Sequence, residues 1–255
     1  MSEARAPKSE DRAARLAREK AYFDAHYESS NRVHQMKYYA ALEPCRVEFM
    51  RRVREYGAGG RVLEYGCGDG EVSMHVAPVA NEAVGIDISE RGVQAARDRA
   101  AKHGFDNTRF EVMDAHETGF EDESFDLIAA TGIIHHLDPP VAFAEIRRLL
   151  KPGGRAVFVE ALGHNPAIAL YRSLTASART EDEAPLKRRD FRAAEGLFGT
   201  VDYEFHGLAT LGVVPFWGTR AGRPLLGALR GIDRALFAVP GLRWNAWAVL
   251  FELRK

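Results

Sequence analysis

A glycine-rich turn over residues 64–70, Glu-Tyr-Gly-Cys-Gly-Asp-Gly, has residue types suited to holding a cofactor. Glycine takes positive φ angles and has no Cβ to keep a ligand away from the backbone. A helix that starts after such a turn offers free N–H groups and the positive end of its dipole. Because the turn follows an apolar run, it predicts a nucleotide-like cofactor lying against the backbone.

An acidic residue falls at the end of the next apolar run. Residues 83–88 read Ala-Val-Gly-Ile-Asp-Ile, which places Asp87 near the carboxyl end of the run. In an α/β sheet, a carboxylate at this position accepts hydrogen bonds from ribose hydroxyls. The competing role of helix N-cap suits Ser89 better, because a helical pattern follows it as far as His103. Asp87 is therefore predicted to bind the ribose of the cofactor.

Two adjacent histidines follow the apolar run over residues 124–131. Ligands of open α/β sheets bind beyond the carboxyl ends of the strands, where an imidazole suits proton transfer near neutral pH. We predict His136 as the catalytic base, with His164 of a later loop as a second candidate. Adjacent side chains are expected to point in different directions, so we predict no joint metal site at His135 and His136 and no metal elsewhere.

The elements that position these residues alternate between strand and helix. This alternation predicts a doubly wound, mostly parallel α/β sheet with helices on both faces. Strands are expected over residues 61–65, 83–88, 107–113, 124–131, 155–162, 200–207 and 245–253. Before them, a helix over residues 44–56 is expected to turn Cys45, Phe49 and Val53 inward.

Three segments, in the same order, resemble motifs of the class I S-adenosyl-L-methionine (SAM)-dependent methyltransferases. Glu64 before Gly-x-Gly-x-Gly resembles the first motif, and Phe-Asp-Leu-Ile over residues 125–128 resembles the signature behind it. The stretch LLKPGGRAVFVEAL over residues 149–162 resembles the third motif. The resemblance covers residues 60–162. It implies a Rossmann-like sheet of seven strands with an antiparallel last strand, SAM as cofactor and S-adenosyl-L-homocysteine (SAH) as product.

The resemblance also implies which positions contact the cofactor. Asp114 matches, by position only, an acid that contacts the adenine ring. A His-His-Leu turn is common in this family and often only lines the cofactor pocket, so this role stays open for His136. The expected cofactor-binding residues are Glu64, Gly66, Cys67, Gly68, Asp87, Ile88, Asp114, Ala115, Thr131 and His136.

The segments outside the resemblance are expected to choose the acceptor of the methyl group. Residues 1–17 are rich in charge and alanine and predict a flexible leader, and residues 18–56 predict a helical lid. The SAM-binding domain is expected over residues 57–255, with acceptor-side insertions at 163–185 and 208–243. The expected acceptor-binding residues are Tyr27, Tyr38, Tyr39, Tyr171 and Arg172.

Composition limits the partners and the compartment. The chain has 255 residues and a formal net charge of −1, which gives no electrostatic argument for nucleic-acid binding. Cys45 and Cys67 lack metal-ligand spacing and fit a reducing compartment. Neither a secretory signal nor an apolar run long enough to span a bilayer is expected. These features predict a cytoplasmic protein.

The insertion over residues 208–243 is apolar and contains tryptophan, and three interpretations of it stay open. Residues 225–237 have helical spacing, with Arg223, Arg230 and Arg234 interleaved. The segment is interpreted as a packed subdomain or homodimer contact, as the wall of an apolar acceptor pocket, or as a basic amphipathic helix on a membrane surface.

The predicted reaction is methyl transfer from SAM to a small, partly apolar metabolite, with oxygen favoured over nitrogen or carbon as the methylated atom. One alternative is methylation of a lipid or quinone at the membrane surface. A nicotinamide-dependent oxidoreductase is disfavoured by Glu71, which stands where the dinucleotide fingerprint has its last glycine. A non-catalytic SAM-binding protein and an aminopropyl-transferring relative are further alternatives.

Overall fold

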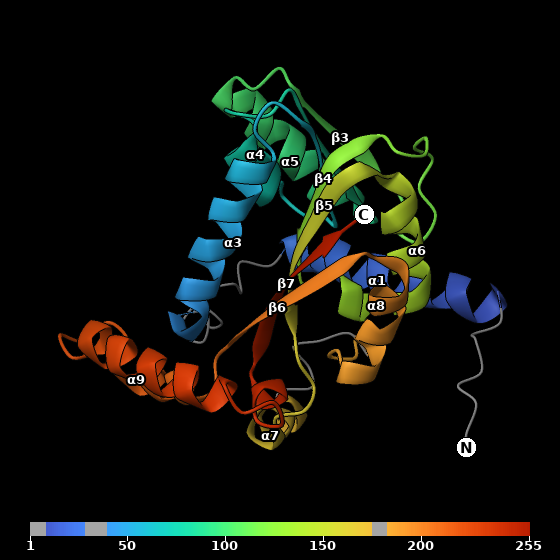
Figure 1. Cartoon of the computed structure of the whole chain (residues 1–255). Coiled ribbons are helices and arrows are strands. Elements are labelled where there is room, and N and C mark those ends of the chain that lie inside the picture. The colour runs from blue at the N-terminus through green and yellow to red at the C-terminus, as the bar shows by residue number, and fades with distance from the viewer. Residues whose placement is uncertain (1–8, 29–39, 175–182) are drawn as a thin grey trace.

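The computed structural model of the protein describes residues 9–28, 40–174 and 183–255 (Figure 1). Its centre is a seven-stranded sheet with the order β3-β2-β1-β4-β5-β7-β6. The strands are β1 (Arg61–Tyr65), β2 (Glu82–Asp87), β3 (Thr108–Val112), β4 (Phe125–Thr131), β5 (Leu150–Ala161), β6 (Thr200–His206) and β7 (Ala248–Arg254). All seven predicted strands are confirmed.

Strand β7 is antiparallel to both of its neighbours, β5 and β6, whereas β1 to β5 pair in parallel. The predicted fold class is therefore confirmed. Strand β5 begins earlier than expected, at Leu150 rather than Arg155. Leu150 pairs with Phe125 before a shift in register, so the Lys-Pro-Gly-Gly stretch that was expected to precede the strand is part of it.

Helices cover both faces of the sheet (Figure 1). On one face lie α3 (Glu43–Tyr56), α4 (Glu71–Val76) and α5 (Glu90–His103), and on the other lie α6 (Pro139–Leu149) and α8 (Arg192–Leu197). The inward residues predicted for α3, Cys45, Phe49 and Val53, are fully buried. Ser89 caps α5 as predicted, because its hydroxyl accepts a hydrogen bond of 3.0 Å from the backbone N–H of Gly92.

The N-terminal helix α1 (Ser9–Glu28) begins inside the expected leader. The prediction of a flexible segment as far as residue 17 is therefore wrong for residues 9–17. The backbone of residues 9–17 is helical, Arg12 pairs with Asp114, and charge with alanine is compatible with either state. Asp24 accepts a hydrogen bond of 2.6 Å from the hydroxyl of Ser89, and Lys20 pairs with Glu90 at 2.5 Å, so α1 lies against the start of α5.

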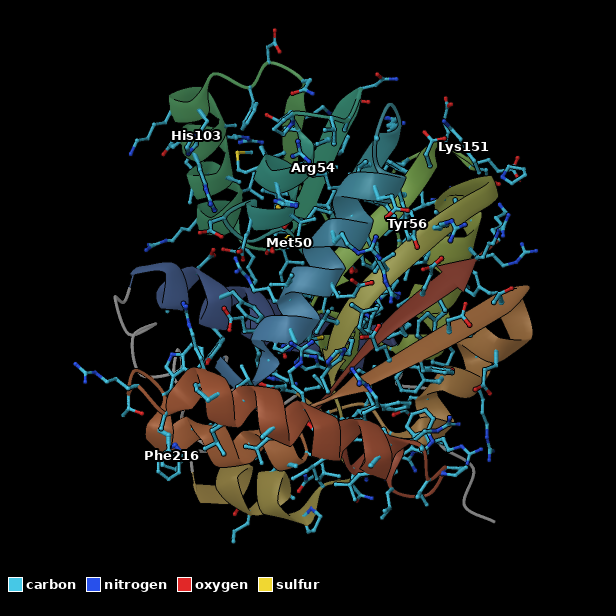
Figure 2. The ribbon with its side chains drawn as sticks, turned by 60° about the vertical axis from the view of Figure 1, so that its left-hand side comes forward. Met50, Arg54, Tyr56, His103, Lys151 and Phe216 are labelled. Atoms are coloured by element: carbon cyan, nitrogen blue, oxygen red, sulfur yellow. The ribbon has the colours of Figure 1, made fainter. Side chains whose placement is uncertain are left out.

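The two insertions lie at the end of the molecule where α7 (Pro166–Leu174) and α9 (Gly222–Phe237) are found (Figures 1 and 2). Helix α9 packs on the short helix η6 (Ala209–Phe216). The buried carboxylate of Asp233 accepts hydrogen bonds from the hydroxyl and backbone of Thr210 and thereby ties the two together. Among the described residues, every helix is too short or too polar to traverse a lipid bilayer.

Candidate active site

A cavity of about 560 Å³ opens at the carboxyl ends of β1, β2 and β4. Helix α1 and the short helix η3 (Ile134–His136) contribute to its wall. Nine of the ten residues predicted to bind a cofactor line this cavity: Glu64, Gly66, Cys67, Gly68, Asp87, Ile88, Ala115, Thr131 and His136. Residues predicted from separate parts of the sequence thus lie together on the wall of one cavity.

The glycine turn approaches the cavity with its backbone. Gly66 has a φ of 77°, in the left-handed region, and a Cβ at this position would lie 2.5 Å from Cδ1 of Ile133. Only glycine meets both requirements at once. The backbone N–H groups of Gly66 and Cys67 both donate to the carbonyl of Ile86, which fixes the turn on β2.

Glu64 connects the turn to the helix behind it. Its buried carboxylate accepts hydrogen bonds from the backbone N–H groups of Val72 and Ser73 and from the hydroxyl of Ser73. These groups belong to the first turn of α4, whose N–H groups have no partner within the helix. Burial raises the pKa of Glu64 to about 7, against the opposing effect of these hydrogen bonds.

Asp87 is held at the edge of the cavity by two backbone donors. Its Oδ2 accepts from the N–H of Gly68 and its Oδ1 from the N–H of Ser89, both at 2.8 Å. Burial raises the pKa of Asp87, and the two backbone hydrogen bonds act in the opposite direction. Each carboxylate oxygen has a second lone pair, so the group is able to accept two further hydrogen bonds from a ligand.

Asp114 is the predicted cofactor residue that does not line the cavity. Its carboxylate pairs with Arg12 at 3.0 Å and lies 2.8 Å from Nδ1 of His116. These partners lower the pKa of Asp114 to about 2, although burial alone would raise it. The structure therefore gives no support to the predicted adenine contact, because the carboxylate already contacts Arg12 and His116 of the protein itself.

Helix α1 supplies the part of the wall that sequence reasoning missed. Its cavity-lining residues are Arg12, Arg15, Leu16, Arg18, Glu19 and Phe23. All of them except Arg18 follow helical spacing and share one face, which the sequence could have indicated. Arg12, Arg15 and Leu16 were instead expected to belong to a flexible leader.

His136 lies under this helix. Its Nδ1 is 3.0 Å from Oε2 of Glu19, its carbonyl accepts a hydrogen bond of 2.8 Å from Arg15, and its ring meets Phe23 edge to face. His136 is thus placed by three residues of α1 on the wall of the cavity. His164, the second predicted base, does not line the cavity. Its Nε2 accepts from the backbone N–H of Arg188, and the position gives no support to a catalytic role.

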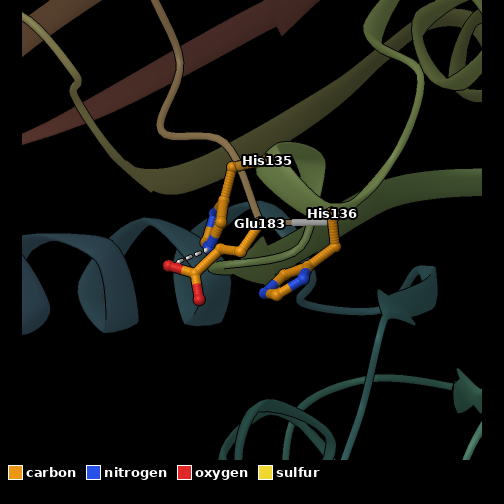
Figure 3. A group of neighbouring side chains, drawn as sticks. All are labelled: His135, His136 and Glu183. Atoms are coloured by element: carbon orange, nitrogen blue, oxygen red, sulfur yellow. Dashed lines mark ion pairs between the residues drawn. The ribbon is translucent and has the colours of Figure 1, made fainter. Parts of the chain in front are cut away.

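His135 is buried beside His136 (Figure 3). Its Nδ1 lies 2.6 Å from Glu160 and its Nε2 lies 3.7 Å from Glu183. Burial lowers the pKa of His135, but the charge and hydrogen bond of Glu160 outweigh this effect and raise it overall. The expectation that the two histidines diverge is wrong, since their ring centroids are 4.4 Å apart.

Of the five residues predicted to bind the acceptor, the structure describes the side chain of only one, Arg172. Tyr38 and Tyr39, and the side chains of Tyr27 and Tyr171, lie outside what the structure describes. Arg172 pairs with Glu183 at 2.7 Å, close to His135. The described residues of both insertions do not line the cavity. Residues of 208–243, among them Thr210, Arg230 and Phe237, instead line a separate pocket of about 370 Å³ beside β6, so the interpretation as a pocket wall stays open there.

Comparison with known proteins decides the family. Residues 57–194, which are more than half of the chain, match the sequence profile of a family described as "Methyltransferase domain". The chain belongs to the class I SAM-dependent methyltransferases. This assignment removes a nicotinamide-dependent oxidoreductase from the alternatives.

Relatives of this methyltransferase act on different atoms. It is 42% identical over 102 residues to 27-O-demethylrifamycin SV methyltransferase of Amycolatopsis mediterranei, covering 38% of the chain and 37% of the relative. It is 36% identical over 110 residues to the ubiquinone/menaquinone biosynthesis C-methyltransferase UbiE of Geobacter sulfurreducens, covering 41% and 43%. The matches thus span less than half of either relative.

The fold of the methyltransferase is shared with solved structures. The YcgJ protein of Bacillus subtilis superposes with a TM-score of 0.59 at 20% identity, over 84% of this chain and 99% of that one. The residues of the cavity fit the family's cofactor SAM. They combine a glycine turn without obstructing side chains, a partly buried carboxylate that can accept further hydrogen bonds and a volume in the range of about 300–1,000 Å³ that is usual for such ligands.

Proposed function

We propose that the protein transfers the methyl group of SAM to an oxygen atom of a small, partly apolar metabolite. The observation that carries the proposal is the composition of one cavity. Its wall joins the glycine turn and Asp87, suited to SAM, with the imidazole of His136, suited to the acceptor. Helix α1 covers both parts and limits the entry of water.

In this proposal, SAM binds to residues at the carboxyl ends of the strands. The carboxylate of Asp87 accepts hydrogen bonds from the ribose hydroxyls, and the backbone of Gly66 and Gly68 lies along the methionine part. Ile88 and Ala115 supply apolar contact for the adenine. The arginines of α1 on the same wall bring positive charge to the side where the carboxylate of SAM is held.

The reaction depends on alignment more than on covalent help from the protein. The acceptor atom must approach the methyl carbon in line with the bond to sulfur, and well-oriented groups gain roughly 7–11 kcal/mol from such placement. A hydroxyl acceptor must also lose its proton. His136, with one ring nitrogen near Glu19, is the cavity residue placed to activate the hydroxyl.

The cavity wall supports an acceptor that is partly apolar. Leucine, phenylalanine, isoleucine and valine side chains alternate with the polar groups named above. The apolar residues on the acceptor side are Leu16, Phe23, Ile133, Leu137 and Val141. Such a wall binds rings and alkyl chains by excluding water from their surfaces. The O-methyltransferase named among the relatives is in keeping with this choice, whereas UbiE, named a C-methyltransferase, keeps carbon as the competing atom.

The test begins with SAH binding by titration calorimetry and continues with methyl-labelled SAM. Label transfer is measured to three panels of probes: hydroxylated naphthoquinols and catechols, primary and secondary amines, and carbon acids. We expect SAH binding and label on an oxygen of the first panel, lost in His136→Ala and retained in His103→Ala, whose side chain is exposed on α5. Label only on nitrogen or carbon would contradict the proposed atom. SAH binding without transfer to any panel would favour a non-catalytic SAM-binding protein.

One surface favours a second acceptor class, a lipid or quinone methylated at a membrane surface. Helix α9 exposes Arg223, Arg230 and Arg234. Nearby, Ile232 is 49% exposed, and Phe216, which is labelled in Figure 2, is 47% exposed. Cations next to apolar side chains suit an anionic lipid surface. Co-sedimentation with vesicles of phosphatidylglycerol, compared with vesicles of phosphatidylcholine, tests this class. Dimerisation without vesicle binding would favour a subunit contact instead.

A further inference from the structure

Three side chains beside the cavity offer ligand atoms to one point. A nitrogen of His135, a nitrogen of His136 and an oxygen of Glu183 all lie within 4.8 Å of one another (Figure 3). The three side chains are only 9%, 11% and 12% exposed, respectively. They come from η3 and from the segment that precedes β6, so the fold brings them together from distant parts of the sequence.

Each imidazole has one ring nitrogen placed at a carboxylate. Nδ1 of His135 lies 2.6 Å from Glu160, and Nδ1 of His136 lies 3.0 Å from Glu19. Metal-binding histidines almost always donate one ring N–H to a carboxylate, which fixes the tautomer and leaves the other nitrogen for the ion. His135 forms this hydrogen bond with Glu160, whereas His136 and Glu19 are close enough for an ion pair without the geometry of a hydrogen bond.

The partner of His135 is itself held firmly. Oε1 of Glu160 accepts hydrogen bonds from the backbone N–H groups of Ile133 and Ile134, at 2.8 and 2.7 Å. Its other oxygen is therefore directed at His135, whose Nε2 faces Glu183 at 3.7 Å. A gap of this length is larger than a hydrogen bond and is close to the separation of two ligands of one metal ion.

Charged groups of both signs lie around this point. Glu19, Glu160 and Glu183 contribute three buried or nearly buried carboxylates. Opposite them stand the guanidinium of Arg172, 2.7 Å from Glu183, and that of Arg15 on the carbonyl of His136. A divalent cation between the histidines and Glu183 would add to the positive charge that faces these carboxylates.

We propose that His135, His136 and Glu183 bind a divalent transition-metal ion of the Zn²⁺ type, next to the acceptor. Two imidazoles and one carboxylate are the ligand set of catalytic zinc and of non-haem iron sites, whereas Mg²⁺ prefers oxygen ligands alone. Three protein ligands leave a position for the acceptor oxygen. The binding of the ion is independent of the proposed function, and its role in activating the acceptor rests on that function.

The ion changes how the acceptor loses its proton. A hydroxyl bound to Zn²⁺ ionises near neutral pH, so in the metal-loaded protein His136 would activate the hydroxyl as a ligand of the ion rather than as a free base, and the proton leaves to solvent. The oxygen then attacks the methyl carbon of SAM, and the C–O bond forms as the C–S bond breaks. The electron pair of that bond stays on sulfur, which gives neutral SAH and the methyl ether. The transfer therefore needs neither an oxidant nor a reductant.

The test uses the full chain, free of tags and dialysed against chelator. Co²⁺ is titrated as a visible-absorption probe, and Zn²⁺ is then added to displace it. We expect a ligand-field band that saturates at one equivalent and disappears with Zn²⁺. His135→Ala and Glu183→Gln should abolish the band, Glu160→Gln should weaken the affinity about 10- to 100-fold, and His103→Ala should leave it unchanged.

Two further measurements distinguish loss of the metal site from loss of the fold or of the cofactor site. SAH calorimetry on each variant shows that the fold and the cofactor site are intact, and X-ray absorption of the Zn²⁺-loaded wild type counts imidazole ligands without any substitution. A missing band, or fewer than two imidazoles, would show that the cluster only shares protons and would overturn the proposed metal site. A metal complex without SAH binding would contradict the proposed function and leave the metal site standing.

Discussion

Oε2 of Glu19 lies 3.0 Å from Nδ1 of His136, so the N-terminal helix supplies the partner of a histidine at the end of β4. Glu19→Gln keeps the shape but removes the charge, and His136→Ala removes the imidazole. We expect turnover to fall about tenfold or more in the first variant and further in the second. SAH affinity, measured by calorimetry, should change little in His136→Ala. Full activity of that variant would reduce His136 to a residue of the cavity wall.

Docking of α1 depends on Asp24 more than on Lys20. Asp24 accepts from the hydroxyl of Ser89, the cap of α5, whereas the Lys20–Glu90 pair has side chains 38% and 69% exposed. Asp24→Ala should destabilise the closed helix by about 1 kcal/mol and weaken SAH binding several-fold. Lys20→Ala serves as the matched control and should have little effect, because exposed ion pairs contribute little. Equal effects of the two would contradict this account.

Removal of the carboxylate of Asp87 should weaken SAH binding about 10- to 100-fold, the loss expected for charged hydrogen bonds to ribose. Asp87→Ala also leaves the N–H groups of Gly68 and Ser89 without their acceptor. Asp98→Asn, on the exposed face of α5, is the control. Calorimetry with SAH gives the affinity, and thermal melting reports any loss of fold. Unchanged affinity would remove the ribose contact assigned to Asp87.

Alanine variants of Gly59 and Gly66 should distinguish the cost of backbone strain from the cost of steric overlap. Gly59 and Gly66 both have positive φ, at 69° and 77°, but a Cβ meets nothing within 4 Å at Gly59 and meets Ile133 at Gly66. Gly59→Ala should cost only the strain, about 1–2 kcal/mol by denaturant unfolding. Gly66→Ala should cost more and should also impair SAH binding, since Ile133 is part of the cavity wall. Similar losses in both variants would show that the contact with Ile133 relaxes freely.

Glu64 should make the protein less stable as the pH rises. Its pKa is raised from the usual 4.5 to about 7 by burial, near Asp69 and Cys67. Between these values the folded protein keeps a proton that the unfolded chain has released, so the free energy of unfolding falls with pH. At about 1.4 kcal/mol per pKa unit the fall approaches ~3 kcal/mol. Glu64→Gln should remove this slope in urea unfolding at pH 4.5, 6 and 7.5. A variant with the wild-type slope would assign the effect to other groups.

The predicted cofactor residues that line the cavity belong to one connected part of the chain. The glycine turn, Asp87 and Thr131 lie at the ends of strands whose apolar patterns are strong and local, so their common edge follows from the alternation of strands and helices. The contribution of α1 could not be predicted in this way. Its contacts with His136 and Asp114 join residues more than a hundred positions apart, and only packing decides them.

Asp114 shows how a distant partner changes a local prediction. The residue follows β3 at the expected place, but Arg12 and His116 engage its carboxylate. For His135 and His136 the local geometry was misjudged. They lie in the 3₁₀ helix η3, where successive side chains are separated by about 120° rather than placed on opposite faces as in a strand. Their rings therefore meet.

Strand β7 lies between β5 and β6, and this position affects the order in which the sheet can be completed during synthesis. A ribosome makes β6 before β7, yet the described part of the sheet pairs β6 only with β7. The strands that carry the cavity, from β1 to β5, already have one another as partners when residue 161 has emerged. Nascent β6 must therefore wait, with its backbone hydrogen-bonding groups unpaired, until residues 248–254 leave the ribosome.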